Sequence, residues 1–426
     1  MKRNQLRGLL ALCLFATANA PATVRYVNVN SASPTPPYTN WATAATTIQD
    51  AVDAAAAGDE ILVTNGVYQT GGKIVTGAGG TNRVAVDKPL LVQSVNGPQF
   101  TVIQGYQVPG ITNGDGAVRC VFLTNGASLS GFTLTNGATV GGGFTVGGSS
   151  GGGVWCHFST NAVVTNCVLV GNSASYSGGG AFEGTLNNCT LTGNSAVLYG
   201  GGATSSRLKN CIVYFNTAPD EANYYSFGSR TLNYCCTTPL PTNGIGNITN
   251  APLFVNLAGG NFRLQSTSPC INSGLNAYAP VGSDLDGNPR IAGGTVDIGA
   301  YEFQAPASVI SYAWLQQYGL PTDGSSDDSD TDLDGHDNWQ EWKAWTIPTN
   351  EFSVLKMLTP QPEMNGMLVR WQSVSGHNYF LERATNVGTP FSVLQSNLVG
   401  QAGTTSFTDT NAAGLGPSLY RVGVAE

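Results

Sequence analysis

The residues best suited to chemistry are the carboxylates of the run DTDLDGHDNWQE, at 330–341. Their spacing fits the pattern D-x-D-x-D-G-x5-E, a twelve-residue loop in which oxygen ligands surround a calcium ion. We expect carboxylate oxygens from the aspartates and Glu341, the backbone carbonyl of His336, and an oxygen of Asn338, directly or through water. The predicted ligands are Asp330, Asp332, Asp334, His336, Asn338 and Glu341. Four carboxylates this close repel one another without a cation, so the sequence predicts a structural Ca2+ site.

A competing interpretation is a disordered linker, because stretches rich in Asp and Ser often bury too little apolar surface to fold. The spacing of the loop favours the metal site, and so does the aromatic stretch Trp339–Trp345, which predicts a helix after the loop. The segment resembles the EF-hand-like and dockerin-type loops of secreted bacterial proteins, although it lacks the second repeat of a dockerin. We interpret it as a structural clip between domains rather than a signalling switch, because extracellular calcium would keep even a weak site filled.

The rest of the chain is organised around a repeat of 22 residues. The segments NCVLVGNSAS, NCTLTGNSAV and NCIVYFNTAP follow one another at this spacing between residues 166 and 218. A fixed period of this length indicates a stacked repeat, and it suits one coil of three short strands better than a pair of helices. In such a stack, equivalent residues lie about 4.8 Å apart, so identical side chains form columns. The period therefore predicts an all-β protein built as a parallel β-helix.

One predicted column consists of cysteines: Cys167, Cys189 and Cys211. Alternation along the strand points Cys189 and Leu191 inward, and Thr190 and Thr192 outward. Stacked cysteines would lie within disulfide range. A free cysteine also behaves as a small buried hydrophobe, and we expect thiols in this column.

Asparagines repeat with the same period in two sets: Asn166, Asn188 and Asn210, and Asn172, Asn194 and Asn216. We expect an asparagine column at a bend, because asparagine tolerates the left-handed backbone conformation. Stacked amides can also hydrogen-bond along the column.

The repeat resembles the right-handed parallel β-helix proteins of the pectin-lyase-like class. Upstream of it, Thr47–Ala57 predicts a short amphipathic helix, and strand-like segments follow from 58 to 105. This order looks like the amino-terminal cap and first coils of that class. A cap of this kind would cover the end of the β-helix, where an exposed sheet edge invites pairing with other chains.

Two motifs after the repeat, DLDGNPR at 284–290 and VDIGAYE at 296–302, resemble the carboxy-terminal signature of the choice-of-anchor Q β-helix proteins. That family consists of bacterial surface or secreted proteins, and the signature implies no common enzymatic activity. Asx turns and capping explain the acidic residues Asp284, Asp286 and Asp297 better than catalysis does.

Four parts of the chain can be distinguished. Residues 1–22 read as a secretion signal, with three basic residues before an apolar run and cleavage after residue 18, 20 or 22. Residues 23–303 form the predicted β-helix, and residues 304–350 a linker with a helix and the calcium loop. Residues 351–426 alternate strand-like and turn-like segments, which predicts a small antiparallel β-sandwich.

The composition limits the possible partners and the cellular location. Removing the signal takes away three basic residues and leaves a formal charge of about −11, which argues against nucleic acid and anionic membranes as partners. No other stretch is long and apolar enough to span a bilayer. The cysteines show no metal-binding spacing. We expect a secreted or cell-surface monomer whose partner, if any, is a polysaccharide or cell-surface glycan.

The outward positions of the repeat lack side chains suited to catalysis. Many proteins of the pectin-lyase-like class cleave polysaccharides with carboxylates on the outer face of one sheet. Six outward positions are predicted, and none can transfer a proton near neutral pH or hold a metal: Val168, Val170, Thr190, Thr192, Ile212 and Tyr214. The first candidates elsewhere are Asp115 with Arg119, and Glu183 with His157, but neither pair shows the spacing of a motif.

The sequence thus favours a non-catalytic β-helix protein used for adhesion, surface display or glycan binding. The alternative is a polysaccharide lyase or glycoside hydrolase with an unrecognised site, and a purely structural spacer is a third possibility. Sugars stack on aromatic faces, and Tyr214, Tyr224 and Tyr225 form the nearest candidate cluster, unless a loop covers it.

Overall fold

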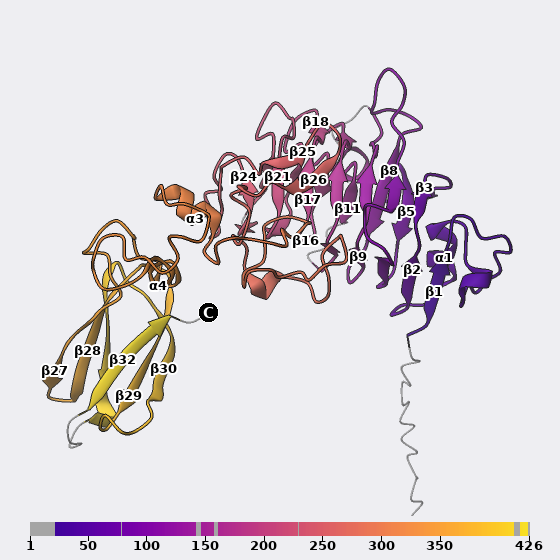
Figure 1. The fold of residues 1–426 in the computed structure, drawn as a ribbon. Helices are drawn as coiled ribbons and strands as arrows, with labels where there is room; N and C mark the ends of the chain where they lie inside the picture. The colour runs from indigo at the N-terminus through magenta and orange to yellow at the C-terminus, as the bar shows by residue number, and fades with distance from the viewer. Residues whose placement is uncertain are drawn as a thin grey trace, which may run out of the picture.

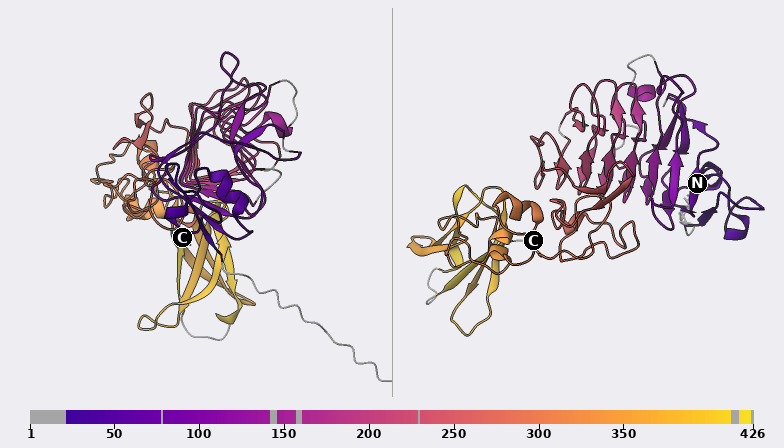
Figure 2. Two further views of the ribbon diagram at one scale, coloured as in Figure 1. Left: turned by 90° about the vertical axis from the view of Figure 1, so that its right-hand side faces the viewer. Right: turned by 45° about the horizontal axis from the view of Figure 1, so that its top comes forward.

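The computed structural model describes residues 22–77, 79–141, 146–156, 161–228, 230–412 and 418–424. The predicted signal segment therefore lies outside the described residues, apart from residue 22. A β-helix forms most of the chain, with α1 (Ile48–Ala54) at one end and a small β-domain at the other (Figure 1). Both views of Figure 2 show that β-domain as a separate body beside the last coils.

Three sheets of parallel strands run along the β-helix, and only β4 pairs antiparallel, with β5. Sheet A contains β1 (Val24–Val27), β2 (Glu60–Val63), β6 (Leu91–Ser94), β9 (Ser128–Ser130), β12 (Val163–Thr165), β16 (Thr185–Asn187), β20 (Arg207–Lys209) and β23 (Leu232–Asn233). Sheet B contains β3 (Gly66–Tyr68), β7 (Thr101–Gln104), β10 (Thr133–Thr135), β13 (Val168–Val170), β17 (Thr190–Thr192), β21 (Ile212–Tyr214) and β24 (Cys236–Thr237). Sheet C contains β4 (Lys73–Ile74), β5 (Thr81–Val86), β8 (Val118–Leu123), β11 (Val154–Cys156), β15 (Ala181–Phe182), β19 (Ala203–Thr204) and β22 (Tyr224–Tyr225).

Each coil visits sheets A, B and C in turn, so the predicted right-handed parallel β-helix is confirmed. Between sheets B and C a short fourth ladder joins β14 (Ser173–Ala174) to β18 (Ser195–Ala196). In the glycine-rich stretch a single turn of helix, α2 (Val146–Ser149), precedes β11. The interior of the coils is one apolar core, which includes Val164, Leu186 and Leu208 from sheet A.

The amino-terminal cap is also confirmed. The hydroxyl of Thr47 accepts a hydrogen bond from the Asp50 backbone N–H and so starts α1. Ile48, Ala51 and Val52 are buried against the first coils, as the amphipathic pattern predicted. A 3-10 turn, η1 (Trp41–Thr43), lies just before this helix.

The asparagine columns occupy bends, as predicted. Asn166, Asn188 and Asn210 all adopt the left-handed conformation, with φ of 48°, 47° and 50°. The second column forms a buried amide ladder. Asn172 Nδ2 donates to Asn194 Oδ1 at 3.0 Å, and Asn194 Nδ2 donates to the next rung, Asn216 Oδ1, at 2.9 Å.

The cysteine column is buried and contains thiols. Cys167, Cys189 and Cys211 are unpaired, and Cys235 extends the column by one coil. Their sulfurs donate to backbone carbonyls, such as Cys211 Sγ to Leu186 O at 3.4 Å. Their redox state in the folded protein stays a prediction.

The closing segment 252–303 lies on the outer face of sheet B instead of adding coils. It contains the antiparallel pair β25 (Phe254–Asn256) and β26 (Asn261–Leu264) and the turn η2 (Asn276–Tyr278). Ile298 and Ala300 pack on Ile212 in a second apolar core, and the Ala300 N–H donates to Thr190 Oγ1 at 3.2 Å. Thr190 and Thr192 point outward as predicted, yet both are buried under this cover.

The carboxy-terminal β-domain has the predicted antiparallel pattern. One sheet contains β27 (Met357–Glu363), β28 (Gly366–Ser373) and β31 (Gly403–Asp409), followed by the turn η3 (Thr410–Ala412). The other sheet contains β29 (Asn378–Ala384), β30 (Ser392–Val399) and β32 (Leu419–Val424). Val369, Trp371, Tyr379 and Leu381 form the buried centre between them.

Candidate metal centre

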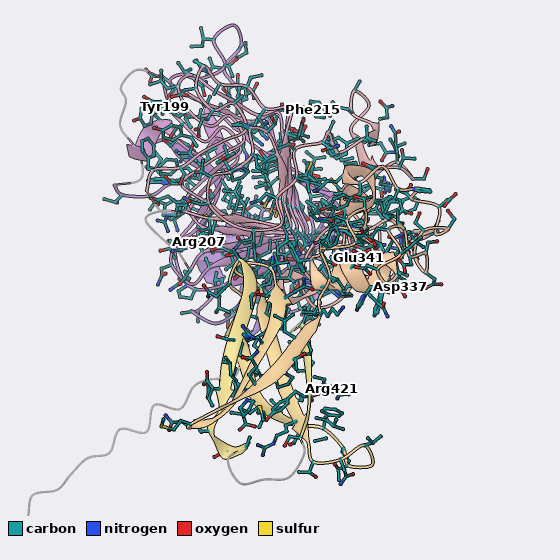
Figure 3. All side chains as sticks on the ribbon, turned by 90° about the vertical axis from the view of Figure 1, so that its left-hand side faces the viewer. Tyr199, Arg207, Phe215, Asp337, Glu341 and Arg421 are labelled. Atoms are coloured by element: carbon teal, nitrogen blue, oxygen red, sulfur yellow. The ribbon has the colours of Figure 1, made fainter. Side chains whose placement is uncertain are left out.

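The linker with the acidic loop contains two short helices. The first helix, α3 (Tyr312–Gln317), is capped by Ser311, whose hydroxyl accepts from the Trp314 N–H. The second helix, α4 (Asn338–Ala344), begins with a capping box between Asp337 and Gln340. Figure 3 shows Asp337 and Glu341 together on this linker, at the top of the carboxy-terminal β-domain.

The three aspartates of the loop converge. Their carboxylate oxygens lie within 4.8 Å of one another, so Asp330, Asp332 and Asp334 could hold a metal ion. Asp330 Oδ1 accepts from the Leu333 N–H at 2.7 Å, and Asp330 Oδ2 accepts from the Gly335 N–H at 2.9 Å. The backbone wraps closely around Asp330 because Gly335 adopts a φ of +98°, which a residue with a side chain rarely reaches.

Glu341, on α4, is 1% exposed and lies near enough for its carboxyl to feel the charges of the aspartates, but it is outside the group of oxygens within 4.8 Å. Its Oε1 accepts from the Thr346 hydroxyl at 3.3 Å. Three buried oxygens have no hydrogen-bond partner among the described residues: Asp332 Oδ2, Asp334 Oδ2 and Glu341 Oε2. Burial, and then the charges of Asp332 and Asp334, raise the pKa of Glu341 to about 8. Buried carboxylate oxygens without donors are costly, and a hard cation would satisfy all three.

The other two predicted ligands are placed differently. The backbone N–H of His336 donates to Asp334 Oδ1 at 2.9 Å, which holds His336 beside the aspartates. Asn338 is fully buried, and its side chain is used within the protein. Its Nδ2 donates to Ser326 O at 2.7 Å, and its Oδ1 accepts from the Thr331 hydroxyl at 2.9 Å. The amide of Asn338 thus fixes the path of the loop, and its role as a ligand stays a prediction.

Two residues that support the loop were missed by the sequence interpretation. Asp327 Oδ1 accepts from the Ser308 hydroxyl at 2.6 Å, and Asp327 Oδ2 accepts from the Val309 N–H at 3.0 Å. The Thr346 hydroxyl donates to Glu341, as described above. Asp327 stands in an acidic run with no fixed spacing, and Thr346 follows the motif, so no local pattern marked either residue.

The candidate catalytic pairs are not assembled among the described residues. Arg119 is buried, donates to Asn82 Oδ1 at 2.7 Å, and lies 5.1 Å above the ring of Trp155. Asp115 is exposed and forms no ion pair with Arg119. This candidate pair is therefore not assembled, because the guanidinium of Arg119 donates to groups within sheet C and to Ser150 O. His157, the predicted partner of Glu183, lies outside the described residues.

The acidic signature residues have structural roles, as predicted. Asp284 Oδ1 accepts from the N–H groups of Asp286 and Asn288 in an Asx turn. Asp297 Oδ1 accepts from the Asn272 N–H at 2.8 Å, and Glu302 Oε2 accepts from the Asp297 N–H at 3.0 Å.

Asp297 and Glu302 form one buried group with Arg290, whose Nη2 lies 3.4 Å from Glu302 Oε2. Burial raises the pKa of Asp297 to about 7. Burial, together with the charge of Asp297, raises the pKa of Glu302 to about 8. No polysaccharide could reach carboxyl groups buried this deeply.

The predicted tyrosine cluster does not exist as one surface. The Tyr214 hydroxyl donates to Thr249 O at 3.0 Å beside the closing segment, while Tyr224 packs against the main core. Tyr225 joins a different aromatic group, with ring centroids 4.5 Å from Tyr199 and 4.6 Å from Phe227. The rings of that group pack on one another, and Phe227 is 46% exposed.

No protein-family model and no curated protein matches the chain. Among solved structures, the crystal structure of pectate lyase Pel9A is similar, with 14% sequence identity and a TM-score of 0.31. The match covers 66% of this chain and 97% of the lyase. Similarity at this level concerns the fold and carries no information on activity. Among the described residues, no helix has both the length and the apolar character needed to cross a membrane.

Proposed function

We propose that the chain is a secreted or cell-surface β-helix protein without catalytic activity, used for adhesion, surface display or glycan binding. In this proposal the acidic loop holds structural Ca2+, with Asp330, Asp332, Asp334 and Glu341 as carboxylate ligands. The predicted secretion signal supports the extracellular location. Extracellular calcium is abundant enough to fill such a loop.

The observation that carries the non-catalytic role is the covering of the sheet faces. The closing segment covers sheet B from β13 to β24, where Val168, Thr190 and Ile212 are buried and Val170 and Tyr214 are half-buried. The outward column of sheet C is also buried and consists of Ala85, Phe122, Trp155 and Phe182. A polysaccharide in either place would have to displace an apolar core.

The outer face of sheet A is open along the described coils, whereas that of sheet B is open only in the first coils, up to β10. Its outward side chains, two per coil, are half-buried or exposed, and most of them are polar. The central coils present Ser128 and Ser130, Val163 and Thr165, and Thr185 and Asn187; the next strand adds Arg207 and Lys209. Among these described outward positions the only carboxylate is Glu60, on an early coil. Such a face can hydrogen-bond a sugar chain but lacks the paired carboxylates of glycosidases.

The test uses residues 23–426 with millimolar calcium and a panel of neutral and acidic polysaccharides. We expect co-sedimentation with at least one polysaccharide, and neither chain shortening nor unsaturated product with any. Thr165→Arg, in the middle of the open face, should weaken binding several-fold. Thr404→Arg in β31 adds the same charge elsewhere and should leave binding unchanged. Turnover that a single carboxylate substitution abolishes would replace this proposal with a lyase or hydrolase. If no polysaccharide binds, surface display would be the one proposed role that remains.

A further inference from the structure

The acidic loop is connected to the β-helix on one side. Asp327 accepts from Ser308, and the backbone carbonyl of Ser308 accepts from Asn272 Nδ2 at 2.8 Å. Asn272 belongs to the closing segment, where its N–H donates to Asp297. Asp327 also accepts, through its backbone carbonyl, from the N–H of Trp339 at 3.0 Å. A continuous series of hydrogen bonds therefore leads from the β-helix to the start of α4.

The same loop is connected to the carboxy-terminal β-domain on the other side. Trp345 ends α4 in the left-handed conformation, with φ of 60°. Its ring lies 4.0 Å from that of His377, with an interplanar angle of 32°. The next residue, Thr346, donates twice to Glu341, from its N–H to the carbonyl at 3.0 Å and from its hydroxyl to Oε1 at 3.3 Å.

The boundary with the β-domain is only partly closed. A cleft of about 260 Å3 separates the linker after Thr346 from the β-domain. The linker lines it with residues such as Ile347 and Phe352, and the β-domain with residues such as Gln372 and Tyr379. Beside this cleft, α4 contacts the β-domain through the stacking of Trp345 on His377 and through its contact with β32.

We propose that a cation in the loop holds the carboxy-terminal β-domain docked on α4, and that loss of the cation releases it. The proposal rests on the proposed calcium binding. Glu341 is the one predicted ligand that α4 contributes beyond its first residue, so a cation that draws in Glu341 also fixes Thr346 and Trp345. In an empty loop no cation links Glu341 to the aspartates, so the loop no longer holds the end of α4 in place. Occupancy would thereby control the position of the β-domain relative to the β-helix.

Thermodynamic linkage supplies the first test. If calcium favours the docked position by some factor, docking raises the calcium affinity by the same factor. A substitution that prevents docking therefore removes this gain in calcium affinity. We expect Trp345→Ala and His377→Ala to lower the calcium affinity about fivefold or more, measured by isothermal titration on the full mature chain. Trp41→Ala is the control, because Trp41 is 43% exposed, like Trp345 at 42%, and lies before α1, away from the loop and from the β-domain. Trp41→Ala should leave the affinity within about twofold of the parent, below the size of a coupling effect.

The outcomes separate the two proposals. An unchanged affinity in His377→Ala would overturn the coupling while leaving the metal site intact. A parent protein that binds no calcium would instead overturn the proposed metal site. Circular dichroism of each variant checks that the β-helix and the β-domain remain folded.

A second readout follows the joint directly. Phe352 is 77% exposed on the linker side of the cleft, which makes the joint a target for chymotrypsin. We expect calcium to slow release of the carboxy-terminal fragment several-fold in the parent protein. The rate in Asp330→Ala/Asp334→Ala should be insensitive to calcium. Equal cleavage rates of the parent with calcium and with chelator would also contradict the proposal.

Discussion

The asparagine ladder and the acidic loop differ in whether their buried polar groups have hydrogen-bond partners among the described residues. In the ladder, the Asn194 amide donates to Asn216, and its oxygen accepts from both the backbone and the side chain of Asn172. Each rung meets its copy in the next coil, so the protein itself satisfies the buried amides. In the loop, carboxylate oxygens of Asp332, Asp334 and Glu341 are buried with no such partner among the described residues.

This difference indicates where the chain depends on something outside itself. A satisfied buried amide rigidifies the fold and needs no ligand. Unsatisfied carboxylates of like charge destabilise the empty loop until a cation joins them. The same criterion assigns a structural role to Asp297 and Glu302, whose oxygens accept backbone N–H groups.

The largest expected effect is on the loop. Asp330→Ala combined with Asp334→Ala removes two of the four carboxylates, and we expect calcium binding to disappear in isothermal titration, where the parent should show one site. Asp286→Ala with Asp220→Ala removes the same charge elsewhere and should leave binding intact. Undiminished calcium binding in the Asp330/Asp334 double variant would mean that the cation lies elsewhere.

The ladder should be the next most sensitive. Asn194→Ala removes the central rung, which takes away the acceptor of the Asn172 backbone N–H and the amide that donates to Leu169 O in the core. We expect the free energy of unfolding to fall by about 3 to 5 kcal/mol, since each orphaned group costs about 1 to 3 kcal/mol. Denaturant unfolding measures this effect. Asn30→Ala, at an exposed turn, should change it by less than about 0.5 kcal/mol. A similar small loss in Asn194→Ala would show that water replaces the rung.

The buried group of Asp297, Glu302 and Arg290 should make the free energy of unfolding depend on pH. The folded pKa values of about 7 and about 8 lie above the ordinary values of 3.8 and 4.5. A carboxyl whose pKa is raised by folding contributes stability below its ordinary pKa, and that contribution is lost as pH rises through the folded value. We expect the free energy of unfolding to fall by about 1 to 3 kcal/mol between pH 5 and pH 9.

Urea unfolding in the presence of chelator measures this dependence without interference from bound calcium. Glu302→Gln keeps the size of the side chain and removes one titrating group, so its pH dependence should be shallower than that of the parent. Stability that instead rises from pH 5 to pH 9 would mean that Arg290 keeps both carboxylates charged.

The sequence allowed the repeating part of the fold to be predicted because its information is local and periodic. A spacing of 22 residues was enough to place Cys189 inside and Asn188 at a left-handed bend. The course of the acidic loop could also be predicted from its sequence, because Asp330 and Gly335 occupy positions that the backbone geometry of the loop requires.

Long-range packing could not be predicted in the same way. Nothing periodic in 252–303 indicates that Ala300 binds Thr190, which lies 110 residues earlier in the chain. Likewise, the attachment of Trp345 to His377 depends on how two domains meet. The tyrosine prediction was wrong for a related reason. Neighbours in sequence, such as Tyr224 and Tyr225, point to opposite sides of a strand, so proximity along the chain did not imply a common surface.

The smallest expected effect concerns the cysteine column, the apolar counterpart of the ladder. Cys189 Sγ donates weakly to backbone carbonyls, and burial raises the pKa of the Cys167 thiol to about 12. Buried thiols are shielded from reagents, so a thiol reagent should modify none of the eight described cysteines in the native protein and all eight after unfolding. Dithiothreitol should leave the melting temperature unchanged. A lower melting temperature under reduction would mean that column thiols pair in the folded protein, and the stack would then be partly covalent.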